Sequence, residues 1–485
     1  MTTRLSSLND VAASLRPNYD PKTMGIGIVH LGIGSFHKAH QAVLTDKAIG
    51  KSGGNWRILG ISLRSARARA ELEPQNGLYT LLVKNNSTVS ARVIASVSNV
   101  IFAKENYKAV MEALVCTNTK IVSLTVTEKA YGFGIDGQGC NINHPSVSWD
   151  INNFDQPKGV LGILVKALSL RRLSGTPPFT VLCCDNLPNN GKLVASAVID
   201  FANVIDPVLA KWIKQNTAFP STMVDRITPA PTQNTLLQAK KITGCVDLGA
   251  VETEPFYQWI IEDNFPQGRP DWEEAGAVFT NDVSPFETMK LRMLNGSHSL
   301  IAYAGFHCGY KYVYEAMTDD RLQTLVRRYI FTASQTLSNK ISIDYAEYAR
   351  SLIERFSNKA LKHKTLQIAM DGSQKIPLRI LFPLEEALNT NVNYRLFAFT
   401  TAAWLRHISG STHDCNAYEL TDPLAQNLSK LNLTSDPEQL ASALYNLGII
   451  QKSLLSKHLV WEEIFIILQE MLSRPMKDVI YSEAT

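Results

Sequence analysis

The feature that most constrains the fold is a short apolar run that ends at glycines. Residues 25–31 read Gly-Ile-Gly-Ile-Val-His-Leu, and Gly32 and Gly34 follow. A continuous apolar run of this kind is typical of a parallel strand that is buried on both faces. Comparable runs lie at 56–63, 121–127 and 179–184. Because helical patterns follow these runs, the alternation predicts an α/β domain with a doubly wound parallel sheet.

The character of the chain changes after residue 284. Strand-like runs become scarce, and long amphipathic stretches such as 322–337 and 345–356 replace them. A chain of 485 residues is also too long for one ordinary hydrophobic core. We therefore expect two domains: an α/β domain over residues 1–284 and a mainly α-helical domain over residues 285–485.

Composition and charge exclude several classes of protein. The net charge is only +4 and the basic residues form no long run, so we expect no nucleic-acid partner. No window approaches about 18 consecutive apolar residues, so we expect no membrane span. The N-terminus lacks the apolar core of a signal peptide, and the seven cysteines contain no Cys-x-x-Cys pair. These features fit a protein of the reducing cytoplasm.

Gly32 and Gly34 stand where a dinucleotide-binding turn would have its first two glycines. In the pattern Gly-x-Gly-x-x-Gly, the first glycine permits a tight turn and the second lets the backbone approach a pyrophosphate. His37 occupies the place of the third glycine. A plain strand-to-helix turn is the alternative, but the position after the first strand favours a cofactor.

The end of the second predicted strand leaves the choice between NAD and NADP open. An acid that binds the ribose is expected about 20 residues after the glycine turn. The segment 63–69 has no carboxylate before Glu71, and it contains Arg64, Arg67 and Arg69. These arginines could meet a 2′-phosphate, or they could belong to the solvated start of a helix.

A helix is expected to begin at Ser284-Pro285, because Ser284 and Glu287 have the spacing of a capping box and proline suits the first helical position. Lys290 then lies in the second turn. On an α-helix, His298 continues roughly the face of Lys290, about 12 Å further along the axis. Asn295 lies at the edge of that face.

This helix has the residues for alcohol oxidation, although its spacing alone favours an ordinary amphipathic helix. Lys290 could accept the hydroxyl proton if burial lowers its pKa towards neutrality. The amides of Asn295 and of Asn186, which follows the strand at 179–184, could stabilise an alkoxide. A metal is not expected: Glu287, His298 and His307 have no established ligand spacing, and Lys290 would repel a cation.

Over approximately residues 25–475 the sequence resembles the polyol-specific long-chain dehydrogenases, the mannitol dehydrogenase family. The pattern Lys-x-x-x-x-Asn-x-x-His at 290–298 is intact. The other blocks that carry the resemblance lie at 28–41, 124–129, 184–188 and 223–229. The resemblance implies a Rossmann-type dinucleotide-binding domain over 1–284, a helical substrate and catalytic domain over 285–485, and metal-independent hydride transfer.

The resemblance also implies roles for individual residues. Lys290 becomes the general base, Asn186 and Asn295 the pair that stabilises the oxyanion, and His298 and Asp225 substrate contacts. Glu287 lies on the proton path to the lysine. The positions expected to contact the cofactor, NAD or alternatively NADP, are Gly32, Gly34, Phe36, His37, Arg64, Arg67 and Glu128.

Within the family, the segment 363–375 most resembles that of the fructuronate reductases, since Gln367 stands where mannitol dehydrogenases usually have arginine. A uronate needs a cationic partner for its carboxylate, and Lys375, Lys364 and Arg292 are the candidates. We expect interconversion of D-fructuronate and D-mannonate by a monomer or small homo-oligomer. Mannitol, arabinitol or altronate oxidation and a non-catalytic dinucleotide sensor are the alternatives.

Overall fold

The computed structural model describes residues 3–86, 88–134, 138–337 and 343–484. The chain forms two compact units, Met1–Ser284 and Pro285–Thr485. Each is described by itself.

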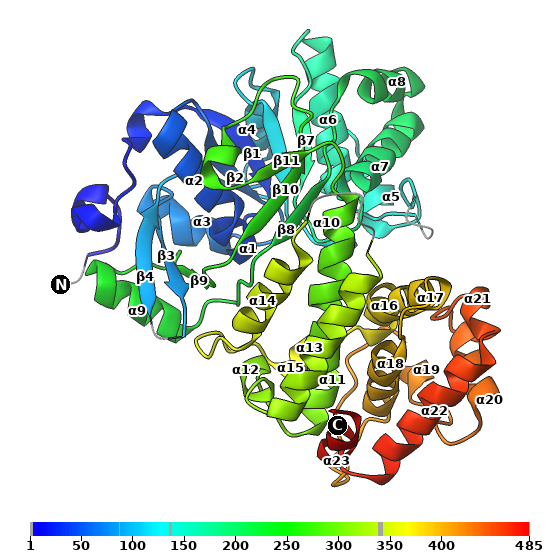
Figure 1. Ribbon diagram of the computed structural model, residues 1–485. Helices are drawn as coiled ribbons and strands as arrows, with labels where there is room; N and C mark the ends of the chain where they lie inside the picture. Colours follow the sequence, from blue (N-terminus) through cyan, green and yellow to red (C-terminus); the bar gives the residue numbers. More distant parts are fainter. Residues whose placement is uncertain (1–2, 87, 135–137, 338–342, 485) are drawn as a thin grey trace. The chain divides into compact units, whose positions relative to one another are not determined.

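The first unit is built on a five-stranded parallel sheet in the order β5-β2-β1-β6-β7. Strands β1, β2 and β7 of this sheet are labelled in Figure 1. Its strands are β1 (Ile26–Leu31), β2 (Arg57–Ser62), β5 (Val97–Phe102), β6 (Ile121–Leu124) and β7 (Thr180–Cys183). The order runs outward from β1 in both directions, which confirms the predicted doubly wound sheet. Four of the five strands coincide with the apolar runs of the sequence, and β5 was not foreseen.

Helices cover both faces of this sheet. The α-helices of the first unit are α1 (Ser35–Ala39), α2 (Gln41–Ser52), α3 (Arg67–Leu72), α4 (Tyr107–Val115), α5 (Pro145–Asn152), α6 (Val160–Leu173), α7 (Asn190–Ile205), α8 (Pro207–Asn216) and, away from this sheet, α9 (Gln233–Thr243). Neighbouring residues of β1 pack into different cores: Ile28 joins one cluster, and Val29 and Leu31 join the other. Burial on both faces is why the strand is apolar without alternation.

Two small sheets complete the first unit, and the sequence did not reveal them. One has the order β4-β3-β9, with β3 (Tyr79–Lys84), β4 (Val89–Ile94) and β9 (Val251–Thr253). The other has the order β11-β10-β8, with β8 (Thr222–Asp225), β10 (Gln258–Glu262) and β11 (Val278–Thr280). Short strands with polar positions carry too weak a periodic signal to be recognised locally.

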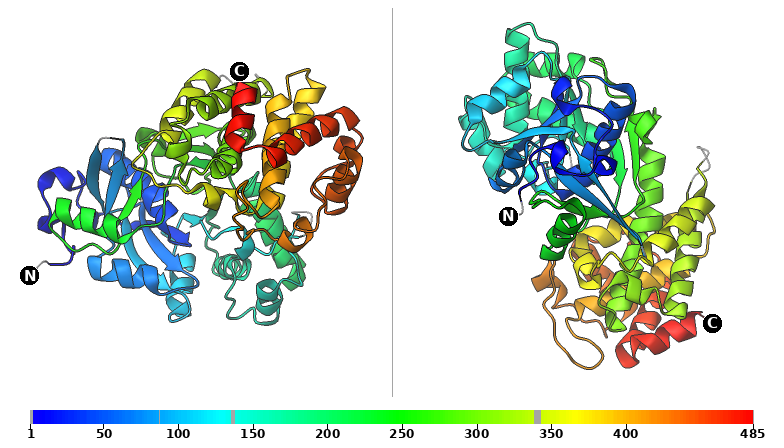
Figure 2. Two further views of the ribbon diagram at one scale, coloured as in Figure 1. Left: turned by 90° about the horizontal axis from the view of Figure 1, so that it is seen from below. Right: turned by 90° about the vertical axis from the view of Figure 1, so that its left-hand side faces the viewer.

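The second unit is mainly helical, as expected (Figure 2). Its α-helices are α10 (Ser284–Met289, which begins at the last residue of the first unit), α11 (Gly296–His307), α12 (Val313–Ala316), α13 (Asp320–Gln335), α14 (Tyr345–Phe356), α15 (Thr365–Ala369), α16 (Gly372–Ile376), α17 (Phe382–Asn389), α18 (Arg395–Ile408), α19 (Ala425–Leu428), α20 (Pro437–Asn446), α21 (Lys452–Leu455), α22 (His458–Ser473) and α23 (Met476–Ala484). Helices α11 and α18 pack together and are buried almost throughout, so they form the centre of this unit.

The expectation of one continuous α-helix through Lys290 is wrong. Residues Lys290–Asn295 form a π-helical turn between α10 and α11, and the Gly296 N–H donates to the Leu291 carbonyl, five residues back. In an α-helix Asn295 would lie about 140° around the axis from Lys290. The wider turn, closed by i→i+5 bonds, brings Asn295 back towards the face of Lys290. A periodicity argument assumes a constant turn and cannot detect this shift.

A second π-helical turn, Pro377–Leu381, lies between α16 and α17 and packs against the first. Here the Phe382 N–H donates to the Pro377 carbonyl. Pro377 has no N–H of its own, so it cannot complete a regular α-helical turn. Turns of this kind are rare and are often found at functional sites.

Candidate functional site

Gly32 and Gly34 are both required after β1, but for different reasons. Gly32 has φ of +95°, and a Cβ atom there would lie 2.2 Å from the Thr125 carbonyl oxygen, so the turn passes close to the segment after β6. At Gly34 a Cβ atom would meet only the Gly32 oxygen, at 3.8 Å. The backbone at Gly34 is therefore open to an approaching ligand, as a pyrophosphate-binding turn requires.

His37 lies beneath this turn rather than at its surface. Its side chain is 1% exposed, and its ring stacks on His30 with 3.5 Å between centroids. His30 in turn hydrogen-bonds Ser123 Oγ and Thr125 Oγ1, both at 2.8 Å. Burial lowers the pKa of His30 to about 3 and that of His37 well below its usual value, so both rings are neutral. Their place favours packing over direct contact with a cofactor.

The helix after the turn is also shorter than a continuous helical pattern suggests. It ends at Ala39, and His40, with φ of −121° and ψ of −90°, separates α1 from α2. Phe36, another expected cofactor contact, is half-buried and stacks on His40 with 5.0 Å between ring centroids.

Asp185 organises the carboxyl ends of β6 and β7. Its carboxylate accepts hydrogen bonds from the Val126 and Thr127 N–H groups, each at 3.0 Å, and from the Tyr131 hydroxyl at 2.7 Å. These bonds hold Thr127 at φ of +73°, which directs the chain into the segment that begins with Glu128. Asn186 follows Asp185 and is exposed.

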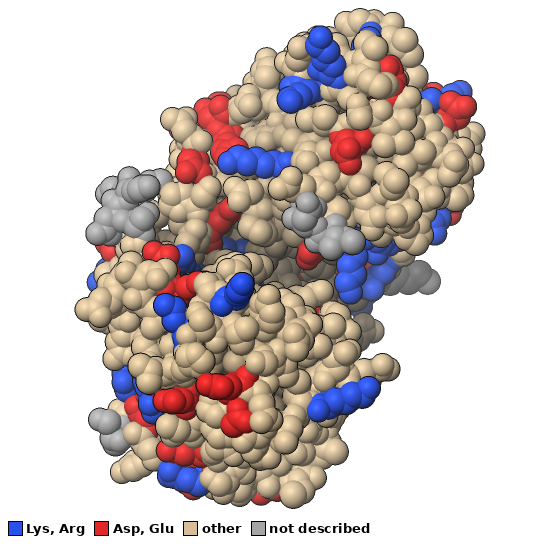
Figure 3. Space-filling view, turned by 90° about the vertical axis from the view of Figure 1, so that its right-hand side faces the viewer, with Lys and Arg blue, Asp and Glu red and all other residues tan. Residues whose placement is uncertain are grey.

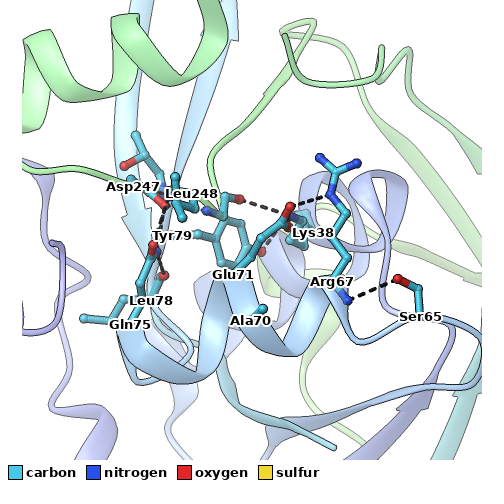
Figure 4. Close-up of polar contacts among 12 residues, drawn as sticks. Lys38, Ser65, Arg67, Ala70, Glu71, Gln75, Leu78, Tyr79, Asp247 and Leu248 are labelled. Atoms are coloured by element: carbon cyan, nitrogen blue, oxygen red, sulfur yellow. Dashed lines mark hydrogen bonds and ion pairs between the residues drawn. The ribbon is translucent and has the colours of Figure 1, made fainter. Parts of the chain in front are cut away.

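The other predicted residues of the first unit occupy distinct places. Asp225 ends β8 and is 4% exposed. Glu128 is exposed at the start of a short 3₁₀ turn (Glu128–Ala130). Arg64 lines an open cavity at the carboxyl edge of the sheet. Arg67 instead makes an ion pair with Glu71, at 2.6 Å, on its own helix α3 (Figure 4).

In the second unit, the side chains best suited to catalysis or substrate binding lie on or beside the two π-helical turns. Lys290 is 9% exposed, which gives the desolvation that a lysine base needs. Glu287, one turn before it on α10, is half-buried. The Asn295 side chain is half-buried, and its amide makes no hydrogen bond with the residues that the structure describes, so its donor and acceptor remain available to a ligand.

A cluster of basic side chains surrounds His298. This imidazole is 7% exposed, its Nε2 has no hydrogen-bond partner among the described residues, and its ring lies edge-on to His363 with 5.4 Å between centroids. Burial lowers the pKa of His298 well below its usual value, and the nearby His363, Arg379, Arg355 and Lys375 lower it further. We call His298, His363, Lys375 and Arg379 the basic cluster.

Lys375 is a half-buried member of the basic cluster. Its ammonium donates to the Met370 carbonyl at 2.6 Å and to the Ile368 carbonyl at 3.3 Å. Burial, with the neighbouring Arg379 charge as the next cause, lowers the pKa of Lys375 to about 8. An ammonium has three donors, so the third remains for a ligand.

The other two candidate partners for a carboxylate lie elsewhere. Arg292 donates to the carbonyl of Thr336 and, at 2.9 Å, to its hydroxyl, after the end of α13. Lys364 is exposed where the chain enters α15. Sequence reasoning missed Arg379, which lies on the second π-helical turn; Pro377 inside a helical pattern is the signal that could have marked this turn.

The described residues include no helix that is long and apolar enough to cross a membrane, and no group of three or more His, Cys, Asp or Glu side chains arranged to hold a metal ion. On the face drawn in Figure 3, acidic and basic side chains are interspersed.

A doubly wound domain with a glycine turn after its first strand, joined to a helical domain, defines a Rossmann-type dehydrogenase architecture. Comparison with family models shows to which family of dehydrogenases the chain belongs. Residues 26–274 match the mannitol dehydrogenase Rossmann domain, and residues 282–472 match the mannitol dehydrogenase C-terminal domain. The chain belongs to the mannitol dehydrogenase family, and it is an oxidoreductase that acts on CH–OH groups.

Three relatives illustrate the family. An uncharacterized oxidoreductase, YeiQ, of Escherichia coli K12 is 41% identical over 89% of each chain. The D-mannonate oxidoreductase of the same organism is 40% identical, again over 89% of each chain. The structure of Pseudomonas fluorescens mannitol 2-dehydrogenase in a ternary complex with NAD and D-mannitol is 32% identical, with a TM-score of 0.88, over 100% of this chain and 99% of the other.

Proposed function

We propose that this protein interconverts D-fructuronate and D-mannonate by hydride transfer with a nicotinamide dinucleotide. The basic cluster carries the proposal, because a uronate or aldonate differs from a polyol chiefly in its carboxylate. A half-buried ammonium with a free donor, beside a half-buried guanidinium, is a fitting partner for such a group. The D-mannonate oxidoreductase relative supports the same substrate class.

We propose that the first unit binds the dinucleotide. The Gly34 backbone is open, and Arg64 lines a cavity of about 880 Å³ at the carboxyl edge of the sheet, where doubly wound folds bind ligands. These features fit the pyrophosphate and the adenosine of NAD, the cofactor in the related mannitol 2-dehydrogenase complex. When bound, the nicotinamide donates or accepts the hydride.

Lys290 is proposed to accept the hydroxyl proton during oxidation and to return it during reduction. Its side chain is only 9% exposed on a π-helical turn, and desolvation of this kind is what a lysine base requires. Glu287 is proposed to pass the proton to and from solvent. The free Asn295 amide is proposed to donate a hydrogen bond to the developing alkoxide.

The remaining roles rest on the family pattern. Asn186 is proposed as the second donor to the oxyanion, and Asp225 as a substrate contact. His298, which burial keeps neutral, is proposed to hydrogen-bond a substrate hydroxyl. Lys375 is proposed to bind the carboxylate, in preference to Arg292, which is bonded to Thr336, and Lys364, which is exposed.

All seven cysteines are free thiols. This state supports the proposal of a cytoplasmic enzyme, since disulfides form and persist mainly in oxidising compartments. We further propose that the enzyme acts as a monomer or small homo-oligomer.

Steady-state rates with purified protein test the substrate assignment. D-mannonate, D-altronate, D-mannitol and D-arabinitol are compared with NAD and with NADP as oxidants. The expected result is a kcat/KM for D-mannonate that exceeds that for D-mannitol by at least about 100-fold, the scale of a lost charge-assisted contact. Oxidation of D-mannitol with none of D-mannonate would reject the proposal, and activity on none of them would favour a sensor.

A further inference from the structure

The cavity at the carboxyl edge of the parallel sheet has a strongly basic lining. It measures about 880 Å³ and is lined by segments that follow β2, β5 and β6 and by residues of α4 to α6. Its basic side chains are Arg64, Lys104, Lys129 and Lys158. Among the lining residues the one acid is Asp150, whose carboxylate accepts hydrogen bonds from the Lys158 and Gly159 N–H groups. The cavity therefore suits an anion.

Arg64 and Lys104 occupy equivalent positions in this lining. In the pairing of β2 with β5, Ser62 lies opposite Phe102, and the Ala103 N–H donates to the Ser62 carbonyl at 2.9 Å. Arg64 and Lys104 each stand two residues beyond that pair, at the carboxyl ends of neighbouring parallel strands. Neither side chain has a hydrogen bond or an ion pair with the described residues, so both cations are available.

The neighbouring charges are, by contrast, already paired. Glu71 is the first carboxylate after β2, and it lies 2.6 Å from Arg67 Nε and 3.8 Å from Lys38 Nζ (Figure 4). Glu105, next to Lys104, lies 2.6 Å from Arg69 Nη1. Neither carboxylate lines the cavity. In NAD-binding proteins an acid binds the ribose 2′-hydroxyl and repels a 2′-phosphate. Neither Glu71 nor Glu105 supplies this acid to the cavity.

We propose that Arg64 and Lys104 together bind the 2′-phosphate of NADP(H), so that this protein prefers NADP(H) to NAD(H). The inference rests on the proposed function, because it concerns the adenosine end of the same cofactor. Two cations from adjacent strands can each donate to a phosphate dianion, Arg64 in a bidentate manner and Lys104 as a point charge. Arg67 does not line the cavity, and its Nε is paired with Glu71.

Binding measurements on the full chain test the proposal without the catalytic reaction. Isothermal titration compares NADPH with NADH, and adenosine 2′,5′-bisphosphate with 5′-AMP, a pair that differs only in the 2′-phosphate. We expect the phosphorylated member of each pair to bind at least about tenfold more tightly. Arg64→Ala and Lys104→Ala should each reduce this preference by a factor between about 3 and about 100. The affinity for NADH should stay within about twofold of the wild-type value.

Matched variants make the result specific. Lys108→Ala removes an exposed lysine of α4 that pairs with Glu112 and lies outside the cavity lining, and it should leave the preference unchanged. Arg64→Asp should reverse the preference towards NADH. All three altered positions are exposed, so folding is not at stake.

Three results would overturn the proposal. The first is equal binding of adenosine 2′,5′-bisphosphate and 5′-AMP. The second is a preference for NADPH that survives in the double variant Arg64→Ala with Lys104→Ala. The third is a preference for NADPH that is lost only in Arg67→Ala. If NADH alone binds and D-fructuronate is still reduced, the 2′-phosphate site fails while the proposed function stands. If neither dinucleotide binds, both fail.

Discussion

Replacement of Lys375 by methionine tests whether the basic cluster recognises a carboxylate. The substitution keeps the length of the side chain and removes the charge that donates to the Met370 and Ile368 carbonyls. A hydrogen bond to a charged group contributes about 1.5–3 kcal/mol, which corresponds to about 10- to 150-fold in affinity. We expect the Kd of D-mannonate, measured by isothermal titration, to rise by that factor in Lys375→Met.

The pH dependence supplies a second measure of the same contact. Because the pKa of Lys375 is lowered to about 8, its ammonium is lost as the pH rises through that value. About nine in ten molecules carry the charge at pH 7 and about one in ten at pH 9. If only the charged form binds, the apparent Kd of D-mannonate rises about tenfold over this interval.

Two variants make the interpretation firm. Lys375→Arg should abolish the pH dependence between pH 7 and pH 9, because a guanidinium stays protonated throughout. Lys362→Met removes an exposed lysine and should leave the Kd unchanged. Circular dichroism checks that each variant is folded. A Kd that is independent of pH in the wild type, or unaffected by Lys375→Met in a folded protein, would refute the reasoning.

Four further predictions concern the lysine base and the glycines. Lys290→Ala should lower kcat by about 10²- to 10⁴-fold, the contribution of a general base, while titration shows cofactor affinity unchanged; wild-type turnover at neutral pH would exclude a lysine base. Gly32→Ala should destabilise the fold by more than about 2 kcal/mol in thermal unfolding, because of its positive φ and the blocked Cβ position. Gly34→Ala should leave stability nearly unaltered and weaken dinucleotide binding instead; equal destabilisation by both changes would contradict the separate roles. Gly296→Ala should disturb the first π-helical turn, since its Cβ atom would lie 2.2 Å from the Tyr329 hydroxyl oxygen, and Tyr329→Phe should partly restore kcat; no rescue in the double variant would argue against that contact.

Much of the architecture could be predicted because burial determines where apolar residues occur along the chain. The strand at β1 is apolar at every position, since Ile28 and Val29 enter different cores. The amphipathic stretch at 345–356 coincides with α14, because one face of a surface helix must be apolar. Both inferences depend only on residues close together in the chain.

The site was predictable only in part, and mainly through the family pattern. The motif at 290–298 identified Lys290 and Asn295, but it did not reveal the π-helical turn that alters how they are presented. Arg379 escaped notice because a single arginine beyond a proline has no periodic signal. Arg64 and Arg67 looked equivalent in the sequence, yet the fold leaves one in a cavity and pairs the other with Glu71.

The sequence by itself therefore determined the doubly wound sheet, the helical second half and the residues of the family motif. The tertiary structure alone decided which cations remain unpaired and which histidines burial keeps neutral. The physical reason is that apolar periodicity records burial along the chain, residue by residue. The charge of Lys375 and the availability of Arg64 depend instead on side chains distant in sequence that the fold brings near, or keeps away.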